Sequence, residues 1–208
     1  MEIGASPLFR GISEESQQAM RTCFDMREVS FRADEVIYDF GAGRNMVGVL
    51  AEGAAVIERI DQQGSRTILE RLESGGVFGE MLMFENVAGD SITVVAETAC
   101  RVWFMAADQV TKRCEKACAH HTQVVENMFQ LVAEKATSLY ERVEVLSRRS
   151  IRDKLMCYFS LMAAKNRSGE FSLPFSTDRS AMMRELKKMR QEELVDVHGR
   201  KVLLQQGV

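Results

Sequence analysis

The stretch TDRSAMMRELKKMRQEELVDVHGRKVLL, residues 177–204, predicts a basic helix followed at once by a short hairpin. Thr177 is a residue type that favours the N-cap, and Asp178 suits the positive end of the helix dipole. Apolar side chains then recur at i, i+4 and i+7, which predicts one stripe that packs against a core. This stripe consists of Met182, Leu186 and Met189.

The other side of this helix is expected to face solvent and is rich in positive charge. It carries Arg179, Ser180, Met183, Arg184 and Lys187. Two short runs with alternating apolar residues follow, 194–197 and 201–204, and a turn at His198–Gly199 joins them. A helix that exposes arginine near its N-terminus beside a hairpin is typical of a winged helix-turn-helix, which enters the major groove of DNA. An ordinary amphipathic helix with a solvated charged face is the alternative.

Positive charge is concentrated at the C-terminal end of an otherwise acidic chain. The net charge is −3 over 208 residues. Residues 147–208 hold 13 Lys and Arg against 7 Asp and Glu, whereas residues 1–146 hold 14 against 23. A basic end on an acidic body predicts a terminal domain that meets phosphates while the rest of the chain has another task.

Length and composition indicate a soluble globular chain with one large domain or two small ones. Hydrophobic residues make up 46% of the sequence and charged residues 27%. There is no run of about eighteen apolar residues, so no membrane span is expected. The start of the sequence lacks the basic and apolar segments of a signal peptide. The 5 irregularly spaced cysteines are typical of reduced thiols, so a cytoplasmic location is expected.

From residue 27 to about 105 the apolar residues alternate with period two, which predicts short strands. A helix capped by Ser13 precedes these strands, and glycine-containing turns at 40–43, 61–64 and 73–76 separate them. Short strands with turns at this spacing are typical of an antiparallel barrel or roll.

After residue 105 the apolar period becomes helical for about forty residues. We expect a long helix that pairs with a parallel copy, because a small roll cannot bury so long an apolar stripe. The predicted dimer interface, at near-heptad spacing, consists of Val125, Met128, Val132, Leu139 and Val143, and Leu146 continues it. Packing within one chain is the alternative. A further helix at 151–164 is predicted to start after Ser150 as its cap.

The order of roll, long helix and basic helix with hairpin resembles the Crp/Fnr family of bacterial transcription regulators. The resemblance is carried by GVLAEGAAVIERIDQQGSRTILERLESGGVFGEM at 48–81, SITVVAETACRVWFM at 91–105 and DRSAMMRELKKMRQEELVD at 178–196. It implies an α+β fold with three parts. These are a jelly-roll-like antiparallel β-roll for an effector at 1–107, a linker and dimerisation helix at 108–146, and a winged helix-turn-helix DNA-binding domain at 147–208.

The resemblance also implies roles for particular residues. In relatives the winged helix reads a palindromic site, so the implied DNA-binding residues are Arg179, Ser180, Arg184 and Lys187. Arginine paired with guanine is the commonest specific base contact, and Ser180 stands where cyclic-AMP-binding relatives have a glutamate, so the half-site should differ. The implied effector pocket consists of Phe78, Gly79, Glu80, Met81, Ser91, Ile92 and Thr93. The implied partners are double-stranded DNA, a second copy and a small-molecule effector, with RNA polymerase left open.

Some departures from the family pattern concern ligands. Cyclic-nucleotide-binding relatives have an arginine for the cyclic phosphate just before the strand that starts at Ser91, and this chain has Asp90 there. A carboxylate repels a phosphate, so cyclic AMP is not expected as the effector, although Glu80, which would meet the ribose, is present. The pocket either takes another small molecule or is closed core. The N-terminal cysteine cluster of iron–sulfur relatives is absent, so no iron–sulfur cluster is expected.

Another departure lies between Ser176 and Thr177. Relatives have the first helix of the helix-turn-helix there, which supports the recognition helix and contacts phosphates. Either the gene is shortened at this point or a segment is missing from this sequence. The second explanation is preferred, and it predicts that the two Cα atoms lie far beyond the ~3.8 Å of bonded neighbours.

One stretch suggests a metal site. Cys114, Cys118 and His121 lie at i, i+4 and i+7, which on an unbroken helix would place two thiols and an imidazole on one face. Such a face can hold a soft metal ion, although three ligands are one short of a closed zinc site. Small buried cysteines are the alternative, and a break in the helix near Ala119 would separate the three side chains. The core is expected to contain Cys23, Cys100 and Cys157.

These observations favour a homodimeric DNA-binding transcription regulator that senses an effector other than cyclic AMP through its roll. Effector binding would change the segment near 146–150 and re-aim two recognition helices. The alternative is a small-molecule sensor or a thiol and metal redox sensor without competent DNA binding. An enzyme is not expected, because His120, His121 and His198 belong to no recognisable acid–base or nucleophile arrangement.

Overall fold

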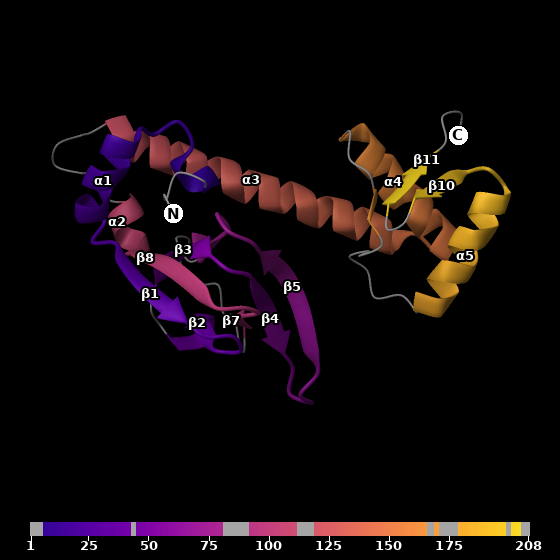
Figure 1. Ribbon diagram of the computed structural model, residues 1–208, viewed down its shortest axis with the longest axis horizontal. Coiled ribbons are helices and arrows are strands. Elements are labelled where there is room, and N and C mark those ends of the chain that lie inside the picture. Colours follow the sequence, from indigo (N-terminus) through magenta and orange to yellow (C-terminus); the bar gives the residue numbers. More distant parts are fainter. Residues whose placement is uncertain are drawn as a thin grey trace. The chain divides into compact units, whose positions relative to one another are not determined.

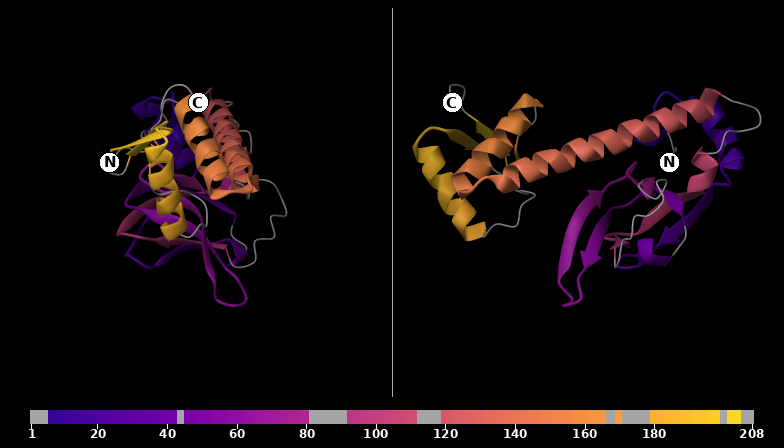
Figure 2. Two further views of the ribbon diagram at one scale, coloured as in Figure 1. Left: turned by 90° about the vertical axis from the view of Figure 1, so that its right-hand side faces the viewer. Right: turned by 180° about the vertical axis from the view of Figure 1, so that it is seen from behind.

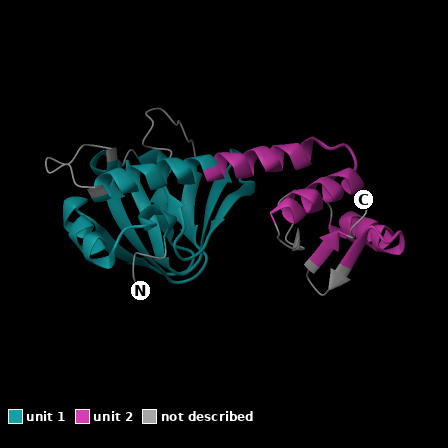
Figure 3. Cartoon of the chain, turned by 90° about the horizontal axis from the view of Figure 1, so that it is seen from above, with its two compact units in different colours: residues 1–133 teal, residues 134–208 magenta. Residues whose placement is uncertain are grey.

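The computed structural model describes residues 6–42, 45–80, 92–111, 119–165, 169–170, 179–198 and 201–204. The chain forms two compact units, Met1–Ala133 and Glu134–Val208, which Figure 3 shows in different colours. None of the helices in the described ranges is long and apolar enough to cross a membrane.

The first unit contains two antiparallel sheets over its described residues. One sheet has the order β1-β8-β3-β6, with β1 at Arg27–Phe31, β8 at Cys100–Ala106, β3 at Met46–Glu52 and β6 at Val77–Phe78. The other has the order β2-β7-β4-β5, with β2 at Val36–Asp39, β7 at Ile92–Ala96, β4 at Ala55–Ile60 and β5 at Arg66–Leu72. The short 3-10 helix η3, Phe40–Ala42, follows β2. The predicted antiparallel strands are confirmed, and the β4–β5 hairpin extends beyond the other strands in Figures 1 and 2.

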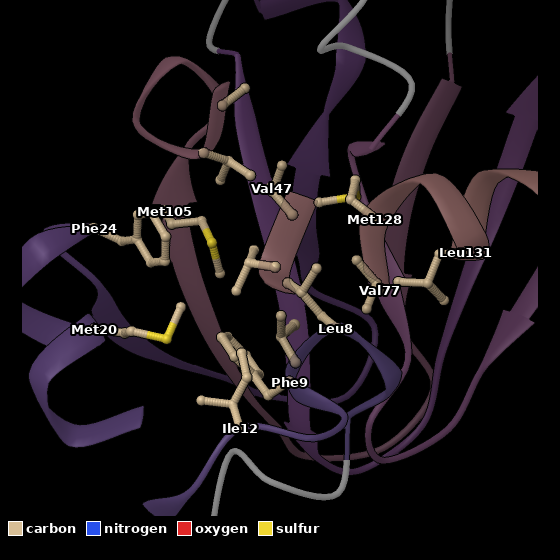
Figure 4. Packing of buried hydrophobic residues seen from close by; sticks show 14 residues of the cluster. Leu8, Phe9, Ile12, Met20, Phe24, Val47, Val77, Met105, Met128 and Leu131 are labelled. Carbon is tan, nitrogen blue, oxygen red and sulfur yellow. The ribbon is translucent and has the colours of Figure 1, made fainter. Parts of the chain in front are cut away.

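A cluster of buried apolar side chains joins the N-terminal helices to one sheet and to helix α3, Ala119–Ser147 (Figure 4). From the 3-10 helix η2, Pro7–Phe9, and helix α1, Glu14–Cys23, with its C-cap come Leu8, Phe9, Met20 and Phe24. The sheet adds Val47, Val77 and Met105, and α3 adds Val124, Met128 and Leu131. Full burial of one such side chain contributes about 1.5–3 kcal/mol, so the cluster holds the start of α3 on the roll.

Polar contacts fix the same two segments. Ser13 caps α1 as predicted, and its hydroxyl accepts a hydrogen bond from the Ser16 amide at 3.3 Å. Asn127 of α3 is 8% exposed and its side-chain amide donates to the carbonyl oxygens of Leu8 and Arg10, both at 2.9 Å. Because a buried amide is costly unless its hydrogen bonds are made, these two bonds favour one orientation of α3 about its axis.

Helix α2, Ala107–Thr111, precedes α3, and residues 112–118 between them lie outside the described ranges. The predicted continuous helical segment after residue 105 is therefore seen as two helices in the described residues. The last turns of α3 belong to the second unit.

The second unit also contains helix α4, Ile151–Ala164, helix α5, Arg179–Gln191, and a small sheet of order β10-β11-β9. Its strands are β9 at Gly169–Glu170, β10 at Val195–His198 and β11 at Lys201–Leu204. Ser150 caps α4 as predicted, accepting from the Asp153 amide at 3.0 Å. The predicted stripe of α5 is confirmed as buried, because Met182, Leu186 and Met189 are 7%, 3% and 0% exposed. They pack with side chains of α4 and the sheet, among them Leu155, Phe159, Val195 and Val202.

Helix α5 ends in a Schellman arrangement that leads directly into β10. The Leu194 amide donates to the Met189 carbonyl oxygen at 2.9 Å, and the Glu193 amide donates to the Arg190 carbonyl oxygen at 3.1 Å. Glu193 has φ 59, a left-handed conformation that costs residues other than glycine about 1–2 kcal/mol. The predicted hairpin follows as β10 and β11, and its turn at 199–200 lies outside the described ranges.

Candidate nucleic-acid interface and effector pocket

Helix α5 presents a charged face opposite its buried stripe. The predicted DNA-binding residues are all exposed: Arg179, Ser180, Arg184 and Lys187. They share this face with Met183, which is 46% exposed. Residues 171–178 lie outside the described ranges, and with them the predicted cap Thr177 and the expected long distance between Ser176 and Thr177.

An ion-pair network joins α4 to α5. Arg152 of α4 donates from Nε to Glu185 at 2.6 Å, and from its two terminal nitrogens to both carboxylate oxygens of Glu192 at 2.7 and 2.8 Å. The hydrogen bonds to Glu192 and then to Glu185 raise the pKa of Arg152, and the bonds from Arg152 lower the pKa of Glu192. A bidentate guanidinium–carboxylate pair fixes the relative orientation of both groups, so Arg152 orients α5 on α4.

Arg152 could not be identified from the sequence, because its partners lie 33 and 40 residues further along the chain. The available signal was the pair Glu185 and Glu192, which lie seven residues apart within and just after a helix that is otherwise basic. Such a pair indicates a cation on a neighbouring element, although it does not say which one.

The turn between α3 and α4 is closed by local hydrogen bonds. Ser147 Oγ donates to the Glu144 carbonyl oxygen at 2.7 Å, and Arg148 Nη2 donates to the Glu144 carboxylate at 2.9 Å. Hydrogen bonds with the Cys157 sulfur and then with Glu144 raise the pKa of Arg148. An open groove of about 690 Å³ lies beside this turn, with Arg148, Arg149 and Cys157 in its lining. The turn coincides with the predicted hinge at 146–150, and its movement stays a prediction.

Helix α3 carries two apolar faces, and they correct one predicted interface residue. Met128 is 3% exposed and lies in the core of the first unit, so it is not available to a second copy. Its neighbour Phe129 is 61% exposed. Farther along the helix Leu139, Val143 and Leu146 are 60%, 56% and 44% exposed.

The corrected stripe has a regular spacing of four and three residues. It consists of Val125, Phe129, Val132, Ala136, Leu139, Val143 and Leu146. Val125 and Val132 are half-buried and the other five are exposed. Alternating steps of four and three residues give the seven-residue repeat of a two-stranded coiled coil. Met128 does not belong to this repeat, because it lies with Val124 and Leu131 on the face of α3 that packs against the roll.

The predicted effector pocket lies at the end of β6 and the start of β7. Phe78 is fully buried, Glu80 is 4% exposed, and Ile92 and Thr93 are half-buried. The remaining predicted pocket residues Met81 and Ser91, and also Asp90, lie outside the described ranges.

Two glycines allow the backbone and the Phe78 ring to occupy these positions. Gly79 has φ 82, and a Cβ atom there would lie 2.2 Å from the Met46 carbonyl oxygen. A Cβ atom at Gly48, which pairs with Phe78 across β3 and β6, would lie 2.1 Å from the Phe78 ring. Contacts this short do not occur, so no residue with a Cβ atom fits at either position. Glycine at both positions therefore allows the Phe78 ring and the Glu80 side chain to be buried.

Aromatic rings fill the roll interior beside these residues. Phe78 lies 5.9 Å from both Tyr38 and Phe104, and Tyr38 lies 5.1 Å from Phe40, measured between ring centroids. The Tyr38 hydroxyl accepts a hydrogen bond from the Met46 amide at 3.3 Å, and burial raises the pKa of Tyr38. The interior is therefore apolar and aromatic, and the Tyr38 hydroxyl is a polar group that these rings surround.

The predicted metal ligands are only partly described. His121 Nε2 lies 2.8 Å from the Val110 carbonyl oxygen, and its ring packs edge-on against Phe24 with centroids 5.1 Å apart. Cys114 and Cys118 lie outside the described ranges. In the part of the chain that the structure describes, no three His, Cys, Asp or Glu side chains are placed to hold a metal ion.

The other three cysteines differ from one another. Cys100 is buried, as predicted, and burial raises the pKa of its thiol. Cys157 is half-buried and packs against the core of the second unit. The prediction that Cys23 belongs to the core is wrong, because Met20 and Phe24 occupy the core side at the end of α1 and leave Cys23 exposed.

Residues 28–117 match the family model of the cyclic nucleotide-binding domain. This range covers the strands of the roll from the second residue of β1 onward and includes α2. The chain therefore contains a cyclic nucleotide-binding domain. No curated protein matches the sequence.

Solved structures of similar fold extend over nearly the whole chain. The c-di-GMP-responsive regulator CLP of Xanthomonas campestris is 13% identical with a TM-score of 0.59, over 91% of this chain and 98% of that one. The catabolite activator protein of Thermus thermophilus is 18% identical with a TM-score of 0.57, over 97% and 94%. FixK2 of Bradyrhizobium japonicum is 20% identical with a TM-score of 0.54, over 87% and 93%. These likenesses show the fold, and its structural neighbours include Crp/Fnr regulators.

Proposed function

We propose that the protein is a transcription regulator that binds DNA as a homodimer and responds to an effector in its roll. The observation that carries the proposal is the exposed face of α5, where Arg179, Arg184 and Lys187 surround Met183. The opposite side of the helix is buried, and Arg152 holds it on α4. A helix held in this way presents its cations in a fixed geometry, which is what reading base edges in a major groove requires.

The exposed residues have three tasks in this proposal. Arg179 and Arg184 would pair with guanine O6 and N7, each pairing giving about 1–3 kcal/mol of discrimination against the wrong base. Ser180 would bond to a donor or an acceptor on a base edge, and Lys187 would contact a phosphate. The excess of 13 Lys and Arg over 7 Asp and Glu in residues 147–208 supports attraction to the phosphate backbone.

The homodimer rests on the corrected stripe of α3. Two parallel copies would bury Phe129, Leu139, Val143 and Leu146 between them, which removes large exposed apolar side chains from water. A two-fold dimer carries two copies of α5, so the operator is expected to be a palindrome with half-sites one helical turn apart.

The proposed effector is a small molecule other than cyclic AMP. Asp90 puts a carboxylate where cyclic-nucleotide-binding relatives hold the phosphate with an arginine. The aromatic rings around Phe78 favour a ligand with an apolar or planar part. Thermal melting with cyclic AMP, cyclic GMP and c-di-GMP, the last chosen because the CLP structure is that of a c-di-GMP-responsive regulator, should show no stabilisation by cyclic AMP. Stabilisation by cyclic AMP at micromolar concentration would contradict this part of the proposal.

The test of DNA binding starts from a random duplex pool. Selection with the purified protein should enrich a palindrome, and fluorescence anisotropy should then show binding that excess random DNA does not displace. Arg184→Ala should relax the preference at the base pair that Arg184 contacts without unfolding the protein, at a cost of about 1–3 kcal/mol per half-site. Arg59→Ala, which removes an exposed arginine from β4 of the roll, is the matched control and should bind as the unmodified protein does.

A salt series separates base reading from phosphate contact. Lys187→Ala should weaken binding to all duplexes alike and reduce the slope of log K against log salt by about 1 per half-site. If selection enriches no sequence and the affinity is equal for every duplex with and without candidate effectors, the proposal fails. The alternative of a sensor without competent DNA binding is then favoured.

A further inference from the structure

Met183 occupies an unusual place for an apolar side chain on α5. It is 46% exposed, whereas Met182 and Met189 on the same helix are 7% and 0% exposed. Residues three and four positions apart are neighbours on a helix surface, so Met183 lies beside Arg179, Ser180 and Lys187. Arg184 follows it in the sequence. The only large apolar side chain on the exposed face, among the described residues of α5, is therefore at the centre of the predicted DNA-binding residues.

The fold gives no reason for an apolar residue at this position. The buried stripe of Met182, Leu186 and Met189 already fills the contact of α5 with the core of the second unit. Met183 leaves close to half of its surface in water, so this apolar surface is open to contact with another molecule. An apolar group on a surface that is otherwise cationic indicates a partner that is anionic overall but offers one apolar contact.

Double-stranded DNA matches this description at one point. Its major groove presents hydrogen-bonding edges on every base pair, and the one apolar group among them is the C5-methyl of thymine. Methionine is unbranched and polarisable, so its side chain can adjust to contact a methyl group at slightly different positions in the groove. We infer that Met183 is a specificity-determining residue that contacts the C5-methyl of a thymine in each half-site. This inference rests on the proposed function of α5.

The expected effect is small and can be separated from the arginine contacts. Removing one methyl contact should weaken binding about four-fold per half-site, which corresponds to about 0.8 kcal/mol at 1.4 kcal/mol per tenfold change. For a dimer on a palindrome with both methyl groups removed, the expected loss is about fifteen-fold.

The experiment uses deoxyuridine, which lacks only the C5-methyl group and keeps every hydrogen bond of thymine. The probe is the duplex obtained by selection with the full chain, with each thymine pair of the palindrome replaced in turn by deoxyuridine. Anisotropy should show one thymine position whose replacement weakens binding by the unmodified protein. In Met183→Ala this penalty should disappear, whereas Met183→Leu should keep most of it because leucine also offers an apolar surface.

Lys187→Ala is the matched control, since it removes a neighbour of Met183 that is proposed to contact a phosphate. The affinity of Lys187→Ala should fall for every duplex. The ratio of its affinity for the thymine duplex to its affinity for the deoxyuridine duplex should equal the ratio for the unmodified protein. An equal deoxyuridine penalty in the unmodified protein and in Met183→Ala would overturn the assignment of Met183, as would no penalty at any position. Failure to select any sequence would overturn the proposed function and this inference together, so the two failures are distinguishable.

Discussion

The adjacent residues Met128 and Phe129 should respond to alanine substitution in opposite ways. Met128 is 3% exposed in the core of the first unit, so Met128→Ala should destabilise the fold by about 2–5 kcal/mol. In a chain of this length that corresponds to a melting temperature lower by roughly 5–15 °C. The dissociation constant of the proposed homodimer, measured at a temperature where both proteins are folded, should change little.

Phe129 should show the reverse behaviour. It is 61% exposed, so of the roughly 200 Å² of a phenylalanine side chain about 120 Å² is left for a second copy to cover. At about 25 cal/mol per Å² this is about 3 kcal/mol per chain, of which alanine would keep about a third. Two copies per dimer then lose about 4 kcal/mol, which raises the dissociation constant about a thousand-fold.

Sedimentation equilibrium over a concentration series measures the association, and denaturant unfolding at fixed concentration measures the fold. Phe129→Ala should sediment as a monomer at concentrations where the unmodified protein and Met128→Ala are dimers. Leu139→Ala, which changes a residue that is 60% exposed and farther along the same stripe, should act in the same direction as Phe129→Ala. Dissociation by Met128→Ala combined with an intact dimer in Phe129→Ala would refute the corrected stripe.

Three further predictions concern α5 and its supports. Arg152→Lys keeps the charge but loses the bidentate pair with Glu192, so the ratio of specific to random DNA affinity should fall on the order of ten-fold, while the exposed Arg149→Lys should leave it unchanged. Because Arg152 depresses the pKa of Glu192 below its ordinary 4.5, the stabilisation from this pair is present above that pH and is lost as the pH falls through the folded-state pKa. Melting curves should therefore show Glu192→Gln less stable than the unmodified protein at pH 7, with the difference shrinking below about pH 4.5; a constant difference would contradict the pairing. Glu193→Gly relieves the left-handed backbone at φ 59, so it should stabilise the protein by about 1 kcal/mol and raise its melting temperature by roughly 2–4 °C without changing DNA affinity.

Local signals in the sequence predicted the local structure well. Ser13 and Ser150 are side chains that accept from the first helical amides, and both cap a helix where expected. The stripe of α5 is buried because a spacing of three and four residues fixes one face of a helix regardless of what packs on it. The antiparallel strands of the roll followed from period two and from glycine turns.

What depends on distant parts of the chain could not be predicted in the same way. From Val125, both Met128 and Phe129 are neighbours on a helix, and only the position of the roll decides which one is buried. Arg152 was missed for a related reason. Its hydrogen bonds to Glu185 and Glu192 form only when α4 and α5 are in contact. Cys23 was placed in the core on residue type alone, and Met20 and Phe24 fill that space instead.

The buried side and the exposed side of α5 consist of different residues, and this has an evolutionary consequence. One side of the helix is needed for folding, through Met182, Leu186, Met189 and the glutamates that Arg152 holds. Met183, Arg184 and Lys187 lie on the other side and outside the core cluster, and substitutions at such surface positions usually change the folding free energy by less than about 0.5 kcal/mol. On the proposed DNA-binding role of α5, duplicated copies of this gene can therefore drift toward new operators through these positions, with selection acting on target choice and hardly at all on protein stability.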